Sequence, residues 1–261
     1  MSQDTDRMPV RETTTGKVRG VRAIGYDAFF GIPYGSAVDG RCRFARPRPA
    51  EPWAGLRDAF AFGAASPQAD LRVTATPGQL PLLNLYYPGF GTPLEGRVSS
   101  ENCLFLNVWA PAGATARPVM VWLHGGAFSG GTGAENWFLG DRLASDENVV
   151  VVSLNHRLGL FGFLPSSDEL GADRTQSGLA GMFDIVLALE WVAANIEQFG
   201  GDPDNVTIFG QSGGGLKVLT LLAMPAAQSL FTRAIVQSIP GIRLIGHEES
   251  ERTLFLSLIH I

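Results

Sequence analysis

The stretch "NVTIFGQSGGGLKV", residues 205–218, joins an apolar run to a glycine-rich turn and the start of a second apolar run. Within it, Gly210, Ser212 and Gly214 form the pattern G-x-S-x-G. This pattern is typical of a serine held in a strained turn between a buried strand and a helix, where neighbouring side chains would collide. The run "VTIF" predicts the strand, and "LKVLTLLAM" at 216–224 predicts the helix. Alone, the pattern also fits a plain structural turn, but this context favours Ser212 as a nucleophile.

Two more continuous apolar runs lie upstream, "PVMVWLHGG" at 118–126 and "NVVVVSLNHR" at 148–157. Such runs are typical of strands buried on both faces of a parallel sheet. Residues 177–201 between the second run and the serine predict an amphipathic helix that ends at Gly200 and Gly201. Strand, helix and strand in this order predict a large α/β fold. The residues at helical spacing are Leu179, Met182, Phe183, Val186, Leu189 and Val192.

The first part of the chain has a different pattern. Residues 10–35 alternate apolar and polar side chains and predict short antiparallel strands, and residues 103–111 predict another strand. Residues 63–100 are rich in proline, glycine and serine and predict a long surface loop. We expect this loop to line a substrate gorge, although one that simply packs over the core fits equally well. Its apolar residues are Leu80, Leu82, Leu83, Tyr86, Tyr87 and Phe90.

Composition excludes several classes of protein. The 261 residues are 45% hydrophobic and carry a net charge of -5 with both signs interspersed, which gives no electrostatic footprint for nucleic acid. The longest apolar stretch, 148–154, is too short to span a bilayer. The first residues lack the apolar core of a signal peptide, so a cytoplasmic location is expected. Cys42 and Cys103 are the only cysteines; two reduced thiols are expected, and the sequence leaves their pairing open.

A second glycine-rich stretch, "HGGAFSGG" at 124–131, follows the first apolar run. Attack on an ester carbonyl places negative charge on oxygen, and rigid N–H donors must already face that position. A loop without bulky side chains supplies such donors beside the N–H of the residue after the nucleophile, here Gly213. The alternative is a plain turn at a strand end. A dinucleotide site is excluded, because the glycine spacing is wrong and no acidic residue is placed for a ribose. No metal or cofactor is expected.

The chain resembles the type-B carboxylesterase and cholinesterase family of the α/β-hydrolase fold over about residues 15–240. The resemblance implies antiparallel strands leading into a mostly parallel sheet with flanking helices, and a small ester as the substrate. It rests on several segments in order: "GIPYG", "RFARPRPAEPW", "SENCLFLNVWAP", "PVMVWLHGGAFSGG", "VSLNHRLGLFGFL", "GLAGMFDIVLALEWVAANIEQFGGDPDNVTIFGQSGGG" and "FTRAIVQS".

The resemblance also implies roles for individual residues. Ser212 would be the nucleophile of an acyl-enzyme mechanism. Family members usually have Glu at the position of Gln211 and Ala at the position of Gly213, and neither difference removes the nucleophile or the donor. The oxyanion donors would be Gly126, Ala127 and Gly213, supported by His124, Gly125, Gly210, Gln211 and Gly214.

Other matched positions belong to the scaffold. The resemblance implies two structural ion pairs, Arg43 with Glu101 and Arg157 with Asp184. Many family members bridge the cysteine that matches Cys103 to one at the position of Ser66. This bridge is therefore expected to be absent here.

A base and an orienting acid for Ser212 are not evident. After the serine, the sequence contains only His247 and His260, with Glu248, Glu249 and Glu251 as nearby acids. His124 and His156 precede the serine, against the family order of serine, acid and histidine. Family members carry the acid and the histidine in a second half.

The expectation is therefore that residues 1–261 form a single partial α/β-hydrolase domain, the N-terminal half, and that this chain alone shows no appreciable turnover. Residues 246–261 fit no family pattern and are expected to be a non-native tail. Oligomeric state is left open. Two alternatives to the esterase remain. One is a non-catalytic interaction domain, like the adhesion proteins among the relatives, which typically lack the serine. The other is a lyase or dehalogenase of the same fold.

Overall fold

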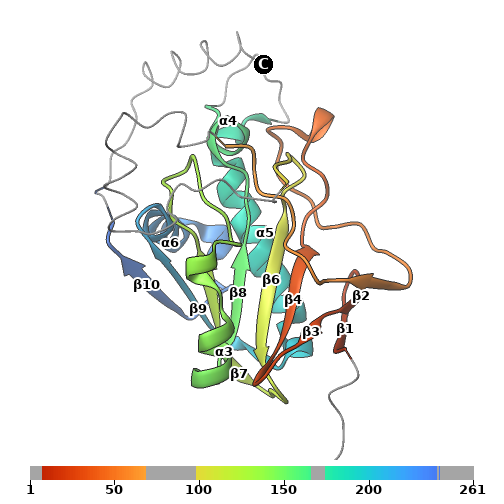
Figure 1. Cartoon of the computed structure of the whole chain (residues 1–261). Helices are drawn as coiled ribbons and strands as arrows, with labels where there is room; N and C mark the ends of the chain where they lie inside the picture. Colours follow the sequence, from red (N-terminus) through yellow and green to blue (C-terminus); the bar gives the residue numbers. More distant parts are fainter. Residues whose placement is uncertain (1–7, 69–97, 166–173, 240, 242–261) are drawn as a thin grey trace, which may run out of the picture.

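A computed structural model describes residues 8–68, 98–165, 174–239 and 241 of the chain. In this part, a seven-stranded sheet runs in the order β10-β9-β7-β8-β6-β4-β3 (Figure 1). Its strands are β3 (Val21–Arg22), β4 (Tyr26–Pro33), β6 (Phe105–Pro111), β7 (Arg117–Leu123), β8 (Val150–Leu154), β9 (Gly201–Gln211) and β10 (Arg233–Gln237).

The half of the sheet formed by β8, β7, β9 and β10 is parallel. Strand β7 pairs in parallel with β8 and β9, and β10 pairs in parallel with β9. In register, Val121 lies opposite both Val152 and Ile208, and all three side chains are fully buried. The three apolar runs are thus central strands, as predicted. Because parallel strands end at the same edge, the segments that follow β7, β8 and β9 lie together there.

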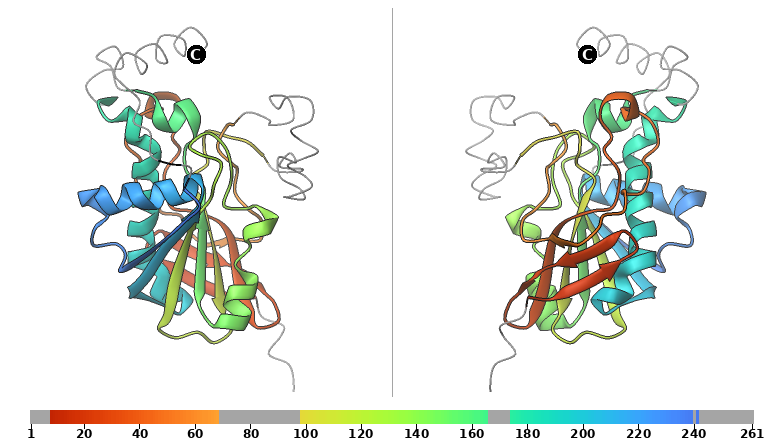
Figure 2. Two further views of the ribbon diagram at one scale, coloured as in Figure 1. Left: turned by 90° about the vertical axis from the view of Figure 1, so that its left-hand side faces the viewer. Right: turned by 90° about the vertical axis from the view of Figure 1, so that its right-hand side faces the viewer.

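Helices cover both faces of the sheet. The long helix α5 (Ala180–Asn195) and α6 (Gly213–Ala223) lie on one face, and α3 (Asp141–Glu147) lies on the other (Figure 2). The short α4 (Gly159–Phe163) packs against α5. Short 3-10 helices complete this part of the chain: η1 (Gly40–Cys42), η2 (Asn136–Phe138), η5 (Ser177–Leu179), η6 (Ile196–Phe199) and η7 (Pro225–Ala227).

The helix predicted over 177–201 is present, but it is not amphipathic. Most residues of α5 are buried, including Ile185, Leu187 and Trp191, which lie outside the predicted apolar stripe. Leu179, which belongs to that stripe, is 43% exposed. The helix is apolar on nearly all sides because other elements cover it beyond the sheet, including α4, α6 and η7. Gly200 ends the helical segment with φ 79°, the left-handed conformation that favours glycine.

The antiparallel strands predicted within 10–35 are present. They are β3 and β4 of the main sheet and a hairpin of β1 (Val10–Thr13) and β2 (Gly16–Arg19), to which β5 (Leu56–Asp58) adds in parallel. Of the long loop, residues 69–97 lie outside the described residues, and with them all six apolar residues assigned to a gorge. A bridge between Ala65 and Ser99 places the two ends of this segment side by side.

One helical stretch of the described chain, 177–199, is long and apolar enough to cross a membrane by length and composition alone. However, 78% of its most apolar window is buried within the fold. This is the burial expected of a core helix.

Candidate active site

The candidate site lies where three parallel strands end. The glycine-rich stretch 124–131 follows β7, residues 155–158 follow β8, and Ser212 follows β9. The topology therefore brings together the two stretches that the sequence singled out.

Ser212 occupies a strained turn between β9 and α6. Its φ of 56° and ψ of -122° lie in a region that residues other than glycine rarely adopt. A Cβ on Gly210 would lie 2.6 Å from the carbonyl carbon of Gly214, and a Cβ on Gly214 would lie 3.0 Å from the His124 oxygen and closer still to the Leu123 oxygen. Both positions therefore require glycine. This close approach of strand and helix is the geometry of a nucleophile elbow.

The 124–131 stretch, hereafter the oxyanion loop, meets the turn directly. A Cβ on Gly213 would lie 2.5 Å from both the nitrogen and the oxygen of Ala127. Ala127 itself has φ 54° and Gly126 has φ 84°, so the loop turns sharply at this point. The backbones of the proposed donors Gly126, Ala127 and Gly213 are thus adjacent. Because α6 starts at Gly213, the positive end of its dipole also faces this position.

Two side chains from other segments form hydrogen bonds with the C-terminal end of the oxyanion loop and with the two residues that follow it. Gln68 binds the Gly131 peptide twice: its Oε1 accepts from Gly131 N at 2.8 Å, and its Nε2 donates to Gly131 O at 3.0 Å. The Oδ1 of Asn155 accepts from the Thr132 hydroxyl and from Gly133 N at 2.9 and 2.8 Å. Neither Gln68 nor Asn155 was predicted from the sequence, because each acts on a segment far from it in the chain.

Three buried basic side chains lie behind the loop. The rings of His124 and His156 stack with centroids 4.9 Å apart, and the Nδ1 of each donates to the carbonyl oxygen of the following residue, Gly125 or Arg157. Burial lowers the pKa of both imidazoles well below its ordinary value, and the Lys217 ammonium lowers it further. Both rings are therefore neutral, and Nδ1 carries the proton that the carbonyl accepts. Lys217, the single charged residue in the run 216–224, donates from Nζ to His124 O at 2.9 Å.

Within the described residues, the Ser212 hydroxyl makes no hydrogen bond to a histidine. His247 and His260 lie outside these residues. His124 and His156 point their protonated nitrogens at backbone oxygens, so they act as supports of the two loops. The Gln211 side-chain oxygen lies 3.5 Å from the position of a Cβ on Gly125, which places it beside the oxyanion loop.

Two ion pairs fasten the scaffold around the site. Arg157 and Asp184 are 1% and 0% exposed, and the carboxylate accepts from the Arg157 backbone N at 2.9 Å and from its guanidinium at 2.7 Å. Arg43 binds both oxygens of Glu101, at 2.5 and 2.6 Å, nearer the surface. Burial of this kind fixes the start of the 157–158 segment relative to α5.

The cysteines are both free thiols. Cys103 is fully buried, and burial is the main reason that its pKa rises to about 12. The charge of Asp184 raises this pKa further, whereas the Ser66 side chain lowers it. Ser66, at the position where family members have a cysteine, also accepts from Leu158 N at 3.0 Å.

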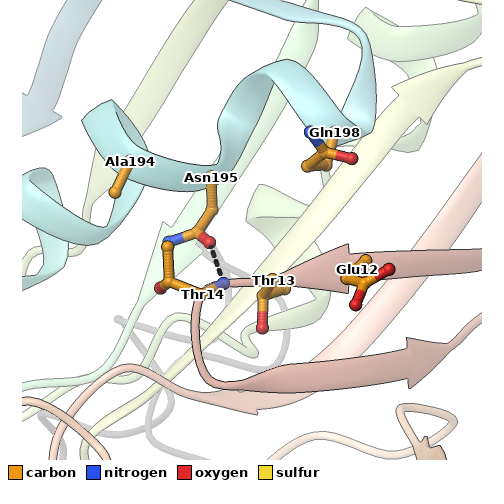
Figure 3. Close-up of a pocket in the computed structure, with 6 residues that line it drawn as sticks. All are labelled: Glu12, Thr13, Thr14, Ala194, Asn195 and Gln198. Carbon is orange, nitrogen blue, oxygen red and sulfur yellow. Dashed lines mark hydrogen bonds between the residues drawn. The ribbon is translucent and has the colours of Figure 1, made fainter.

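A hollow of about 350 Å³ lies far from these loops, between the β1–β2 hairpin and the end of α5 (Figure 3). The Asn195 side chain there accepts from Thr14 N at 2.7 Å and donates to Trp191 O at 2.9 Å. Its polar atoms therefore tie the hairpin to the helix, and we assign the hollow to the scaffold.

Comparison with known proteins agrees with this geometry. Residues 7–249 match the model of the carboxylesterase family. The chain is 44% identical over 227 residues to the para-nitrobenzyl esterase of Bacillus subtilis (strain 168), which covers 87% of this chain and 42% of that protein. It is 42% identical to the acetylcholinesterase of Danio rerio, over 87% of this chain and 34% of that protein. A solved PNB esterase superposes with a TM-score of 0.81 at 39% identity, over 97% of this chain and 49% of that one.

The site and sheet together define an α/β-hydrolase fold with a nucleophile elbow. The chain belongs to the carboxylesterase family, as the sequence resemblance predicted. It spans about half the length of the relatives that it matches.

Proposed function

We propose that the protein is a serine carboxylic-ester hydrolase in which Ser212 forms an acyl-enzyme. The Ser212 oxygen attacks the ester carbonyl, the bond to the alcohol oxygen breaks, and the serine proton passes through a base to the departing alcohol. Water then hydrolyses the acyl-serine. The family resemblance implies that the base is a histidine from the second half of the family fold.

The observation that carries this proposal is the contact between the elbow and the oxyanion loop. The strained Ser212 projects from the edge of the sheet directly before Gly213, and Gly213 lies against the Ala127 backbone. Backbone N–H groups at this junction are held by the fold, so they need no reorganisation when charge develops on the carbonyl oxygen. Loss of one such donor costs on the order of 100- to 1,000-fold in rate.

The relatives support an ester as the substrate, since their names are those of esterases. Gln68 and Asn155 hold the oxyanion loop rigid, which serves acyl chemistry better than a plain turn would. A non-catalytic interaction domain needs neither the strained serine nor this rigid loop.

The experiment is covalent trapping, which reports on the nucleophile, its base and the oxyanion donors together without requiring turnover. We expect the protein joined to the second half of the family fold and incubated with diethyl 4-nitrophenyl phosphate to gain one diethylphosphoryl group on Ser212, measured by intact mass and peptide mapping. Ser212→Ala should remove the adduct, whereas Ser145→Ala, at a partly exposed position on α3, should leave it unchanged. No Ser212-dependent adduct, or an equal adduct in Ser212→Ala, would overturn the serine mechanism.

A further inference from the structure

Lys217 is a fully buried lysine beneath the candidate site. It lies on α6, five positions after Ser212, and its side chain is 0% exposed. Lysine is almost never buried completely unless a partner compensates its charge, because removal of an ammonium from water is costly. Within the described residues, no carboxylate forms an ion pair with it.

Lys217 makes a hydrogen bond and a cation–π contact with the oxyanion loop. Its Nζ donates to His124 O at 2.9 Å, and its ammonium lies 5.8 Å from the centre of the Phe128 ring. The His124 oxygen belongs to the peptide whose N–H is that of Gly125. Because a peptide is planar, a bond that fixes the oxygen also fixes the direction of the Gly125 N–H. The Lys217 ammonium group therefore sets the orientation of the first peptide in the loop.

The other groups around Lys217 supply no competing positive charge. His124 and His156 are neutral for the reasons given above, and Arg157 is paired with Asp184. Glu135, just before η2, is the acidic residue whose charge acts on the Lys217 ammonium. Among the residues that the structure describes, the Nε2 atoms of both imidazoles are buried without a hydrogen-bond partner, so the hydrogen bonds of His124 and His156 run through Nδ1.

We propose that Lys217 is a positioning residue for the oxyanion loop, and that its charge-assisted hydrogen bond to the His124 oxygen fixes the Gly125 amide and, through it, the orientation of the adjoining donor amide of Gly126. The importance of this hydrogen bond for catalysis rests on the proposed function. Its effect on the order of the oxyanion loop does not. A protonated lysine makes a stronger hydrogen bond than a neutral amine, so this hydrogen bond weakens when Lys217 loses its proton. Because Lys217 is buried, its ammonium group loses the proton with a pKa of about 7.

The chain is well suited to a direct test, because Lys17 and Lys217 are its only lysines. Protein labelled with [6-¹³C, ζ-¹⁵N]lysine gives two side-chain signals, and Lys17→Met assigns them. We expect the Lys217 signal to titrate near pH 7. In the unmodified protein, the amide shifts of Gly125 and Gly126 should move with the Lys217 midpoint. Amides that do not respond while Lys217 titrates would overturn the proposal.

Two substitutions extend the test to loop mobility. Lys217→Met removes the donor and keeps the length of the side chain, and Lys217→Gln keeps a neutral donor. We expect amide hydrogen exchange over 124–131 at pH 6 to rise about tenfold or more in Lys217→Met and less in Lys217→Gln, with α5 unchanged. Equal exchange over residues 124–131 in the wild type and Lys217→Met would contradict the proposal that Lys217 orders the oxyanion loop.

The covalent trap separates this inference from the proposed function. The ratio of wild-type to Lys217→Met trapping rate constants should be about tenfold at pH 6 and fall as pH rises through 7. A ratio of one at every pH would overturn the catalytic importance of Lys217. Altered exchange in Lys217→Met, with no trapping even in the wild type, would refute the serine mechanism and retain the hold on the loop.

Discussion

Gly213 lies so close to Ala127 that the backbone of the turn after Ser212 packs directly against the oxyanion loop. A methyl group on Gly213 would lie 2.5 Å from the Ala127 nitrogen, although family members usually have alanine at this position. Ala127 in turn adopts φ 54°, a left-handed conformation that is unfavourable for alanine. The glycine at 213 and the left-handed Ala127 are linked, because the position of the loop at Ala127 leaves no room for a side chain on residue 213.

This contact predicts a coupled pair of substitutions. Gly213→Ala should destabilise the protein by about 1–3 kcal/mol, because the methyl group must displace backbone. Ala127→Gly alone should change stability by less than about 1 kcal/mol, since relief of the left-handed alanine is offset by greater freedom of the unfolded chain. In the Ala127→Gly background the loop can move, so the cost of Gly213→Ala should fall by about 1 kcal/mol or more. Chemical unfolding of the four proteins gives this coupling, and strict additivity would contradict it.

The buried Lys217 predicts an unusual dependence of stability on pH. Its pKa is about 7 in the folded protein and about 10.4 when unfolded. The folded-state pKa is depressed, so the stability cost is present in full below about pH 7 and disappears as pH rises toward 10.4. Three pKa units correspond to about 4 kcal/mol, from which the lost hydrogen bond to His124 must be subtracted.

Lys217→Met should therefore raise the free energy of unfolding by about 1–3 kcal/mol at pH 6.5 and by less at pH 9.5. Denaturant unfolding at the two pH values measures the difference, with Lys17→Met as the matched control that shows no such change. A Lys217→Met advantage that grows with pH would have the wrong sign. The same substitution is expected to loosen the oxyanion loop, so stability and loop order should move in opposite directions.

Local patterns predicted the fold and the strand-to-helix turn at Ser212 well, for physical reasons. The G-x-S-x-G turn and the central strands depend on residues adjacent in sequence, and Ser212 lies where that pattern places it. The burial of α5 was mispredicted, because it depends on which other elements cover the helix. Gln68 and Lys217 were missed because their partners lie 63 and 93 positions away. The lone charge of Lys217 in an apolar helix was the one available signal.

The buried ion pair predicts a large effect of a small substitution. Asp184→Asn should destabilise the protein by about 3–5 kcal/mol, because it leaves the Arg157 guanidinium buried and without a counter-charge. The matched control is Asp146→Asn, which breaks an exposed pair with Arg142 and should cost less than about 1 kcal/mol. Thermal and denaturant unfolding compare the two variants. Similar small losses in both would show that the Arg157 charge finds another partner or reaches water.

The neighbouring positions of Ser66 and Cys103 predict that a disulfide can be introduced. The Ser66 side chain lies near enough to the Cys103 thiol to lower its pKa, so Ser66→Cys should form a bridge under oxidising conditions. Closing a loop of this length stabilises by about 4 kcal/mol in the chain-entropy model. Loss of the hydroxyl that accepts from Leu158 N removes about 1–3 kcal/mol, which leaves a net gain of about 1–3 kcal/mol. Unfolding with and without reductant isolates the contribution of the bridge, and Ser66→Ala gives the cost of the lost hydroxyl alone. Free thiols that persist in oxidised Ser66→Cys would show that the two side chains do not meet as the structure places them.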